Sequence, residues 1–287
     1  DVVITTFGDM MRVPGSSGSL LDEKANGADV RVVYSTLDAL ALAEQESNKQ
    51  VVFMGIGFET TIPTIARAIR LADDNHVVNF LVYMAGKTMP EPMDVLAGDP
   101  EIGLHGFLCP AHVSTIIGTR AYEPIVEKYH IPCVAAGFEP LDILQGVLML
   151  MEQVASGTAR VENEYSRVAT VEGNRTAQEL MAAVLEPCAA QWRGIGVIPN
   201  SGLKIRTAYA AHDAQVRFHD ELAGSLKPDS SKAVSLHACQ CGEVLKGKIV
   251  PPQCPLFGKA CTPQNPVGPC MVSSEGSCSA YYRYERE

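Results

Sequence analysis

The chain has 287 residues, of which 46% are hydrophobic and 20% charged, and its formal net charge is −10. A surface with this charge repels phosphate backbones, which argues against nucleic acid as a partner. No apolar run approaches the 18 or so residues of a membrane span, and the beginning of the chain does not resemble a signal peptide, so we expect a cytoplasmic protein that meets no membrane.

Short β-branched runs alternate with helical patterns through the first 155 residues. The expected strands are residues 2–6, 30–34, 51–54, 78–84, 106–108 and 132–135. Amphipathic stretches predict helices over residues 36–45, 61–72, 114–129 and 140–155. Apolar strands that alternate with helices indicate parallel sheets covered on both faces, and therefore an α/β fold with Rossmann-like domains. Ligands of such folds bind beyond the carboxyl ends of the strands.

The pattern weakens after residue 155, where residues 162–171 and 194–198 predict strands and residues 176–185 predict a helix. Residues 226–287 hold 7 of the 18 prolines and 6 of the 9 cysteines. A proline-rich segment with few apolar periods builds only a small core, so we expect a metal site to stabilise it. The expected organisation is residues 1–48 as part of a first α/β domain, 49–155 as a second, and 156–287 as a cysteine-rich C-terminal region.

The C-terminal cysteines have the spacing Cys241-x12-Cys254-x6-Cys261-x16-Cys278. This segment contains neither the CxxC pairs of a zinc ribbon nor a ferredoxin spacing. Wide and unequal spacing favours an iron–sulfur cluster held from separate loops, while zinc, disulfides or unligated cysteines stay open on spacing alone. Cys239 and Cys270 are additional thiols that either lie beside the ligands or replace one of them.

Acidic residues recur where a predicted strand leads into a helix. Residues 57–59 and 137–139 both read Gly-Phe-Glu, and Phe7-Gly8-Asp9 is a looser version. Each carboxylate could simply cap a helix, which stabilises it by about 1 kcal/mol. Three acids at equivalent turns also favour a shared cleft.

Two further features of these turns have alternative explanations. The stretch Gly55-Ile56-Gly57 follows a strand, as in a dinucleotide-binding turn, but Thr60 replaces the third glycine, so a nucleotide-dependent enzyme is a weaker alternative. His112 stands at another strand-to-helix turn and is either a structural histidine or a ligand-binding one.

Four stretches of the chain resemble signature motifs of the HypD family of [NiFe]-hydrogenase maturation factors. They are TFGDMMRVPG at residues 6–15, GFETT at 57–61, HVSTIIG at 112–118 and AGFEPLDIL at 136–144. The tail from Cys241 to Cys278 resembles the cluster-binding end of the same family.

The resemblance implies a redox scaffold that binds iron while the Fe(CN)2CO centre of [NiFe]-hydrogenases is assembled, rather than a stand-alone metabolic enzyme. It implies a HypC-type small chaperone and a HypE-type cyanide donor as partners. It also implies a [4Fe-4S] cluster that relays electrons and is held by Cys241, Cys254, Cys261 and Cys278. A scaffold with a structural zinc tail is the alternative.

Within that resemblance we expect one cleft in which carboxylates orient thiols or accept protons and Arg12 binds anionic cyanide-bearing species. The expected cleft residues are Asp9, Arg12, Glu59, Thr60, Thr61, His112, Glu139 and Asp142.

The chain departs from the family pattern in two respects. It has neither the Cys-Gly-Gly-His motif expected to hold iron nor the Gly-Pro-Gly-Cys-Pro-Val-Cys redox pair, and it does not begin with Met, so we expect an N-terminal truncation. Residues 109–112 read Cys-Pro-Ala-His where a Pro-Gly-His turn is usual in the family.

Overall fold

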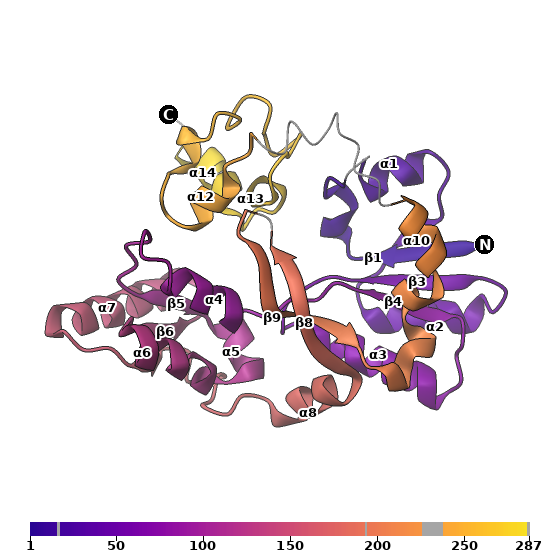
Figure 1. The fold of residues 1–287 in the computed structure, drawn as a ribbon, viewed down its shortest axis with the longest axis horizontal. Helices are drawn as coiled ribbons and strands as arrows, with labels where there is room; N and C mark the ends of the chain where they lie inside the picture. Colours follow the sequence, from indigo (N-terminus) through magenta and orange to yellow (C-terminus); the bar gives the residue numbers. More distant parts are fainter. Residues whose placement is uncertain (16–17, 193, 226–237, 286–287) are drawn as a thin grey trace.

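Two parallel sheets, one antiparallel hairpin and a small cysteine-rich lobe make up the fold (Figure 1). The computed structural model describes residues 1–15, 18–192, 194–225 and 238–285. We call the units the first lobe, the second lobe, the hairpin and the thiol lobe. The first two lobes lie on either side of the hairpin, and the thiol lobe lies at the hairpin's far end.

The first lobe is built on a four-stranded parallel sheet in the order β2-β1-β3-β4. The strands are β1 (Val2–Thr6), β2 (Val30–Val32), β3 (Gln50–Gly55) and β4 (Phe80–Met84). Its helical elements are η1 (Gly8–Arg12), α1 (Leu20–Ala25), α2 (Thr36–Gln45), α3 (Ile62–Asp74), η3 (Thr207–His212), α9 (Ala214–Arg217) and α10 (His219–Ser225). Phe53 and Ile65 belong to the core between the sheet and α2 and α3, while Ala214 packs on the opposite face.

The second lobe contains a three-stranded parallel sheet in the order β5-β6-β7. Its strands are β5 (Phe107–Pro110), β6 (Cys133–Ala136) and β7 (Val161–Asn163). Its helices are α4 (Pro90–Ala97), α5 (Ala111–Ile117), η2 (Thr119–Tyr122), α6 (Glu123–Tyr129) and α7 (Pro140–Ser156). Tyr122, Ile125, Cys109 and Cys133 form its core.

The hairpin contacts both the first lobe and the thiol lobe. It consists of β8 (Leu185–Trp192) and β9 (Gly196–Ile205), and it follows α8 (Arg175–Val184), which packs on α3. Leu185 and Ile205 at its base belong to the core of the first lobe. Farther along, the Leu203 amide donates to the Gly86 carbonyl at 3.0 Å, so β9 continues the hydrogen bonding beyond the end of β4.

The thiol lobe has short helices and a core made largely of sulfur. The helices are α12 (Cys241–Leu245), η4 (Pro251–Gln253), α13 (Pro269–Val272) and α14 (Ser277–Tyr284). Four buried cysteines share this core with only two other buried residues, Val244 and Met271. Since little apolar area is buried, the lobe needs a further source of stability, as its composition predicted.

The α/β fold with parallel sheets and a cysteine-rich C-terminal region is confirmed. The expected boundary between residues 48 and 49 falls inside the first sheet, because β3 pairs with β1. The second lobe begins only after β4, with α4. The expected helix over residues 114–129 is split into α5, η2 and α6, and the expected strand over residues 162–171 is reduced to β7.

The split after α5 has a physical cause at Gly118. This residue has φ +81° and ψ 158°, a backbone conformation open essentially only to glycine. The amide of the next residue, Thr119, donates to the Thr170 carbonyl at 3.1 Å, and a Cβ on Gly118 would lie 2.3 Å from the Val171 carbonyl oxygen. The chain therefore turns here to pair α5 with the segment that precedes α8.

Replacing Gly118 by alanine should reduce the free energy of unfolding by about 3 kcal/mol, because the positive φ and the overlap with Val171 both disfavour a side chain. Gly27→Ala is the matched control, since Gly27 has φ +100° with no heavy atom within 4 Å of the added carbon. We expect a loss of only about 1 kcal/mol there. Urea unfolding of both variants measures the difference, and equal losses would contradict the proposed steric role.

Candidate functional site

Six cysteines from separate segments surround one small cavity in the thiol lobe. They are Cys239, Cys241, Cys254, Cys261, Cys270 and Cys278, and Phe257, Gly268 and Met271 complete the lining. All but Cys239 are buried. Four of these thiols, Cys241, Cys254, Cys261 and Cys278, are the ligands that the family resemblance implies, and the structure brings all four together. It also brings in Cys239 and Cys270, whose positions the spacing left open.

The thiols around this cavity interact with one another and with the backbone. The Val267 amide donates to Cys261 Sγ at 3.3 Å. The contact with Cys241 lowers the pKa of Cys270, but a hydrogen bond with Cys278 and burial outweigh it and raise that pKa to about 11. The same hydrogen bond lowers the pKa of Cys278. The hydrogen bond between the two thus favours negative charge on Cys278 over Cys270.

The residues present suit an iron–sulfur cluster. Thiolates are the ligands that such clusters take, and four buried thiols at one cavity meet the required number. Within the described ranges, no three His, Cys, Asp or Glu side chains converge closely enough to form a site for a single metal ion.

The hairpin turn touches the thiol lobe through two glycines. A Cβ on Gly242 would lie 2.3 Å from the Gly194 carbonyl oxygen, and a Cβ on Gly194 would lie 3.6 Å from Cys241 Sγ. The two backbones can approach this closely only without side chains. A second contact is the ion pair between Lys248 of the thiol lobe and Glu101 of the second lobe. The cavity is therefore fixed relative to both sheets.

Glu59 is the most perturbed carboxyl group at the carboxyl edge of the first sheet. Its side chain is buried, and its Oε1 accepts from the Met89 amide at 2.8 Å, at the start of α4. The Oε2 atom is buried without a hydrogen-bond partner. Burial is the main cause of a pKa raised to about 6. Glu59 therefore does cap a helix, which was the simpler explanation for these acidic residues. The helix that it caps is α4, however, and not α3, which follows Glu59 in the sequence.

The candidate residues of the second lobe lie around the turn after β6. Asp142 is buried and accepts from Arg167 at 2.5 Å. The guanidinium also lies 4.0 Å from the Tyr165 ring centroid. The His112 ring is exposed and packs edge-on against Phe138, with 4.6 Å between the centroids. Asp142 is therefore held in an ion pair, whereas His112 is free to meet a ligand at the surface.

The remaining candidates occupy the same carboxyl edges but are accessible to solvent. Asp9, Arg12, Thr60 and Glu139 are exposed, and Thr61 is partly buried. Glu139 begins α7 without a side-chain capping bond. Arg12 lines a cavity between the loop before α1 and residues 263–266 of the thiol lobe. Of the first-lobe candidates, Arg12 thus lies beside the thiol lobe, while His112 and Asp142 of the second lobe lie around the Phe138 turn.

The first-lobe candidates meet the second lobe at Glu59, which accepts the hydrogen bond from the Met89 amide at the start of α4. The negative charge of Glu59 contributes, after burial and Cys109, to raising the pKa of Tyr122 in the second lobe. The Tyr122 hydroxyl lies 3.1 Å from Ser114 Oγ, in the helix that also carries His112. Glu59 is thus directed toward the second lobe. None of the described contacts joins Arg12 directly to Glu139, so the single cleft expected from the sequence stays a prediction.

Sequence reasoning missed a cationic and aromatic group beside Glu59. Lys87 donates to the Gln191 carbonyl at 2.6 Å and lies 4.7 Å from the Trp192 ring centroid. Trp192 also packs near Phe58, with the centroids 6.1 Å apart. Burial lowers the pKa of Lys87. This cluster appears only when the hairpin meets the first sheet, so no local motif in the sequence indicated it.

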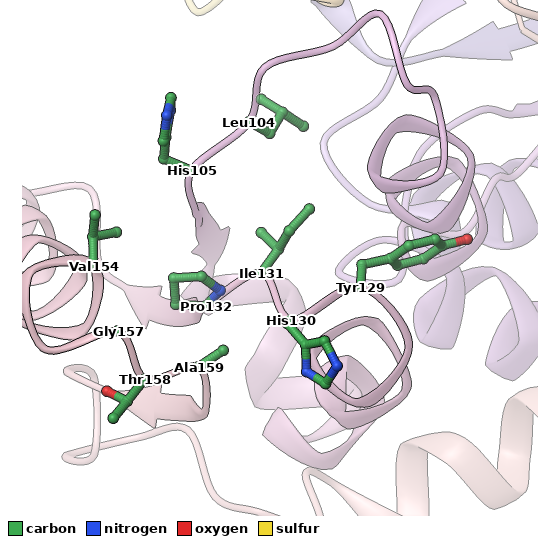
Figure 2. Close-up of a pocket in the computed structure, with 10 residues that line it drawn as sticks. All are labelled: Leu104, His105, Tyr129, His130, Ile131, Pro132, Val154, Gly157, Thr158 and Ala159. Atoms are coloured by element: carbon green, nitrogen blue, oxygen red, sulfur yellow. The ribbon is translucent and has the colours of Figure 1, made fainter.

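A second cavity lies at the amino end of the second sheet (Figure 2). His105 and His130 are on its lining, and their rings lie apart from one another in Figure 2. Ligands of parallel sheets bind at the opposite, carboxyl end. We therefore place the candidate site at the carboxyl edges and at the thiol cavity.

None of the described helices is both long and apolar enough to cross a membrane.

The chain is similar to known hydrogenase maturation proteins over nearly its whole length. Residues 1–285 match the model of the family described as "HypD: Hydrogenase formation hypA family". The chain is 48% identical to hydrogenase maturation factor HypD of Rhodobacter capsulatus, over 99% of this chain and 74% of that protein. It is 46% identical to hydrogenase maturation factor HypD of Escherichia coli K12 (100% and 75%) and 45% identical to hydrogenase expression/formation protein HupD of Azotobacter chroococcum (100% and 76%).

The raised pKa of Glu59 predicts a specific pH dependence of stability. Because its pKa is about 6 in the fold and 4.5 as a reference value, the protonated form favours the fold, and stability falls as the pH rises from 4.5 through 6. Glu59→Gln keeps an acceptor for Met89 and cannot ionise. As the pH rises from 4.5 to 7.5, the free energy of unfolding of the variant should increase by about 2 kcal/mol relative to that of the wild type.

Chemical unfolding of wild type and Glu59→Gln at several pH values measures this effect. Glu139→Gln serves as the control, because Glu139 is exposed and makes no capping bond. Parallel pH curves for wild type and Glu59→Gln would show that the carboxyl group ionises normally in the fold.

Proposed function

Because the chain belongs to the HypD family of hydrogenase maturation factors, we propose that it acts as an iron-binding redox scaffold in the assembly of the Fe(CN)2CO centre of [NiFe]-hydrogenases. The observation that supports this role most strongly is the cavity surrounded by six thiols, fixed beside the carboxyl edges of the first lobe by the contact between Gly194 and Gly242.

We infer that Cys241, Cys254, Cys261 and Cys278 hold a [4Fe-4S] cluster in this cavity. When bound, such a cluster supplies reversible one-electron transfer. The protein contributes the burial of the thiols and the Val267 amide, whose hydrogen bond stabilises negative charge on Cys261. Residues 226–287 carry 7 Lys and Arg against 5 Asp and Glu, and this excess offsets part of the thiolate charge.

The iron that is assembled would be a substrate at the carboxyl edges rather than a resident metal. Glu59, with a pKa of about 6, can both hold and release a proton near neutral pH. Arg12 is exposed beside the thiol lobe and can bind an anionic, cyanide-bearing species through its guanidinium. Asp142 acts through Arg167, which it fixes in place, and is therefore a positioning residue.

The accessible members of the candidate set define where partners would meet the scaffold. His112, Thr60 and Glu139 are exposed at the ends of their strands, where a second protein can reach them. We propose that a HypC-type chaperone and a HypE-type cyanide donor engage the molecule at these edges. Thr61 is partly buried and packs against Gly57, so it shapes the turn that presents Glu59.

The cluster assignment is tested by anaerobic purification followed by measurement of iron and acid-labile sulfide. The wild type should be brown and contain both elements, whereas Cys254→Ala and Cys261→Ala should lose most of the sulfide, because each removes one of four ligands. Cys188→Ala is the matched control, since Cys188 lies in β8 outside the cavity.

A colourless wild type that contains zinc without sulfide would overturn the cluster assignment and support a structural zinc tail. Equal sulfide in Cys188→Ala and Cys254→Ala would likewise remove Cys254 from the ligand set.

A further inference from the structure

Helix α7 has its apolar side directed away from the lobe to which it belongs. The side chains it buries are those of Asp142 and Gln153, together with the bare backbone at Gly146. Large apolar side chains are exposed instead, with exposed fractions of 75% for Leu141, 68% for Leu144, 40% for Val147, 48% for Leu148, 63% for Met151 and 47% for Val154. This reverses the usual arrangement of a helix that covers a sheet.

The inner face of α7 fixes the helix in this orientation. A Cβ on Gly146 would lie 2.8 Å from the Ala136 Cβ, so the helix backbone sits directly on β6. Gln153 donates to Glu162 at 2.7 Å and accepts from the Arg160 amide at 2.8 Å. Rotating the helix would break these bonds and push bulky side chains into the close contact at Gly146. The apolar residues therefore stay outside.

The exposed residues form a stripe suited to a second helix. Leu141, Leu144, Leu148 and Met151 recur at intervals of three and four residues, which places them along one side of α7. Phe138, which is 56% exposed, extends the stripe at its amino end and contacts His112. The stripe is thus continuous with the carboxyl edge of the second lobe. Exposed apolar surface of this kind marks an interaction site.

We propose that the outer face of α7 is the docking surface for a basic amphipathic helix of a partner protein. Residues 88–173, which make up the second lobe, contain 12 Asp and Glu against 4 Lys and Arg, for a net charge of −8. Such a field attracts a cationic partner and accelerates its association. It also repels an anionic membrane surface and a second copy of the same lobe.

The size of the face argues in the same direction. A helix of 17 residues is about 25 Å long and about 10 Å wide, so its outer face offers roughly 250 Å². A stable dimer buries about 800 Å² on each partner. The α7 face is therefore too small to hold two copies together by itself, but it suits one helix of a transient partner, anchored by a few apolar side chains. The inference needs neither the cluster nor the proposed maturation chemistry.

The test uses the full chain and a synthetic probe. The probe is a fluorescent peptide of about 18 residues, with leucines at helical spacing and lysines elsewhere, and a second peptide has glutamate in place of every lysine. Fluorescence anisotropy measures binding to wild type and to Leu144→Gln/Met151→Gln. The Lys peptide should bind the wild type, and it should bind the double variant about tenfold more weakly. The Glu peptide should bind the wild type at least about tenfold more weakly than the Lys peptide does.

Val78→Gln is the matched control, because Val78 is 76% exposed in the first lobe and away from α7. It should bind like the wild type. Absence of Lys-peptide binding, or equal binding by the double variant, would overturn the proposal.

Two alternative occupants give different results. Sedimentation showing a wild-type dimer that Leu144→Gln/Met151→Gln converts to a monomer would assign the surface to a second copy of the chain. Flotation with phosphatidylserine vesicles that the double variant abolishes would assign it to a membrane. Either result would overturn the proposal of a partner helix.

Discussion

The position of the thiol lobe depends on a close approach between two backbones, at Gly194 in the hairpin turn and Gly242 in the thiol lobe. The hairpin's base is anchored by Leu185 and Ile205 in the core of the first lobe. Its turn reaches the residue next to Cys241. The hairpin holds the thiol lobe in place relative to the first lobe because both ends of the hairpin are packed. Neither Gly194 nor Gly242 leaves room for a side chain between the hairpin and the thiol lobe.

The three lobes that the hairpin brings together differ in the burial and the charge of their side chains. The thiol lobe concentrates sulfur in a cavity, and the first lobe presents Glu59, a carboxyl group that its buried position keeps close to half-protonated near pH 6. The second lobe carries most of the negative charge and an outward apolar helix. The chain belongs to the HypD family of hydrogenase maturation factors, and the proposed scaffold role would use these surfaces together.

The strands could be predicted because apolar β-branched runs such as the one around Val51 are buried on both faces of a sheet. The thiol cavity could be predicted in part, because the spacing set apart four cysteines that do line it, but it left the place of Cys270 open. The break at Gly118 could not, since its cause is a contact with Val171, far along the chain. The strand signal of β8 is weak because the segment contains Pro187, a residue that is rare inside strands. The cluster of Lys87 and Trp192 therefore went unseen as well.

The most direct measurement is the effect of Gly242→Ala on hydrogenase maturation, with the variant expressed from the complete gene in a strain that lacks its own HypD-family factor. A Cβ at Gly242 would overlap the Gly194 carbonyl and separate the thiol lobe from the hairpin without altering a thiol. Gly103→Ala is the control, because an added carbon there meets no heavy atom within 4 Å and the residue has no positive φ. If the lobe must be held against the carboxyl edges, Gly242→Ala keeps its acid-labile sulfide while hydrogenase activity falls about tenfold or more. Full activity with the lobe displaced would contradict that requirement.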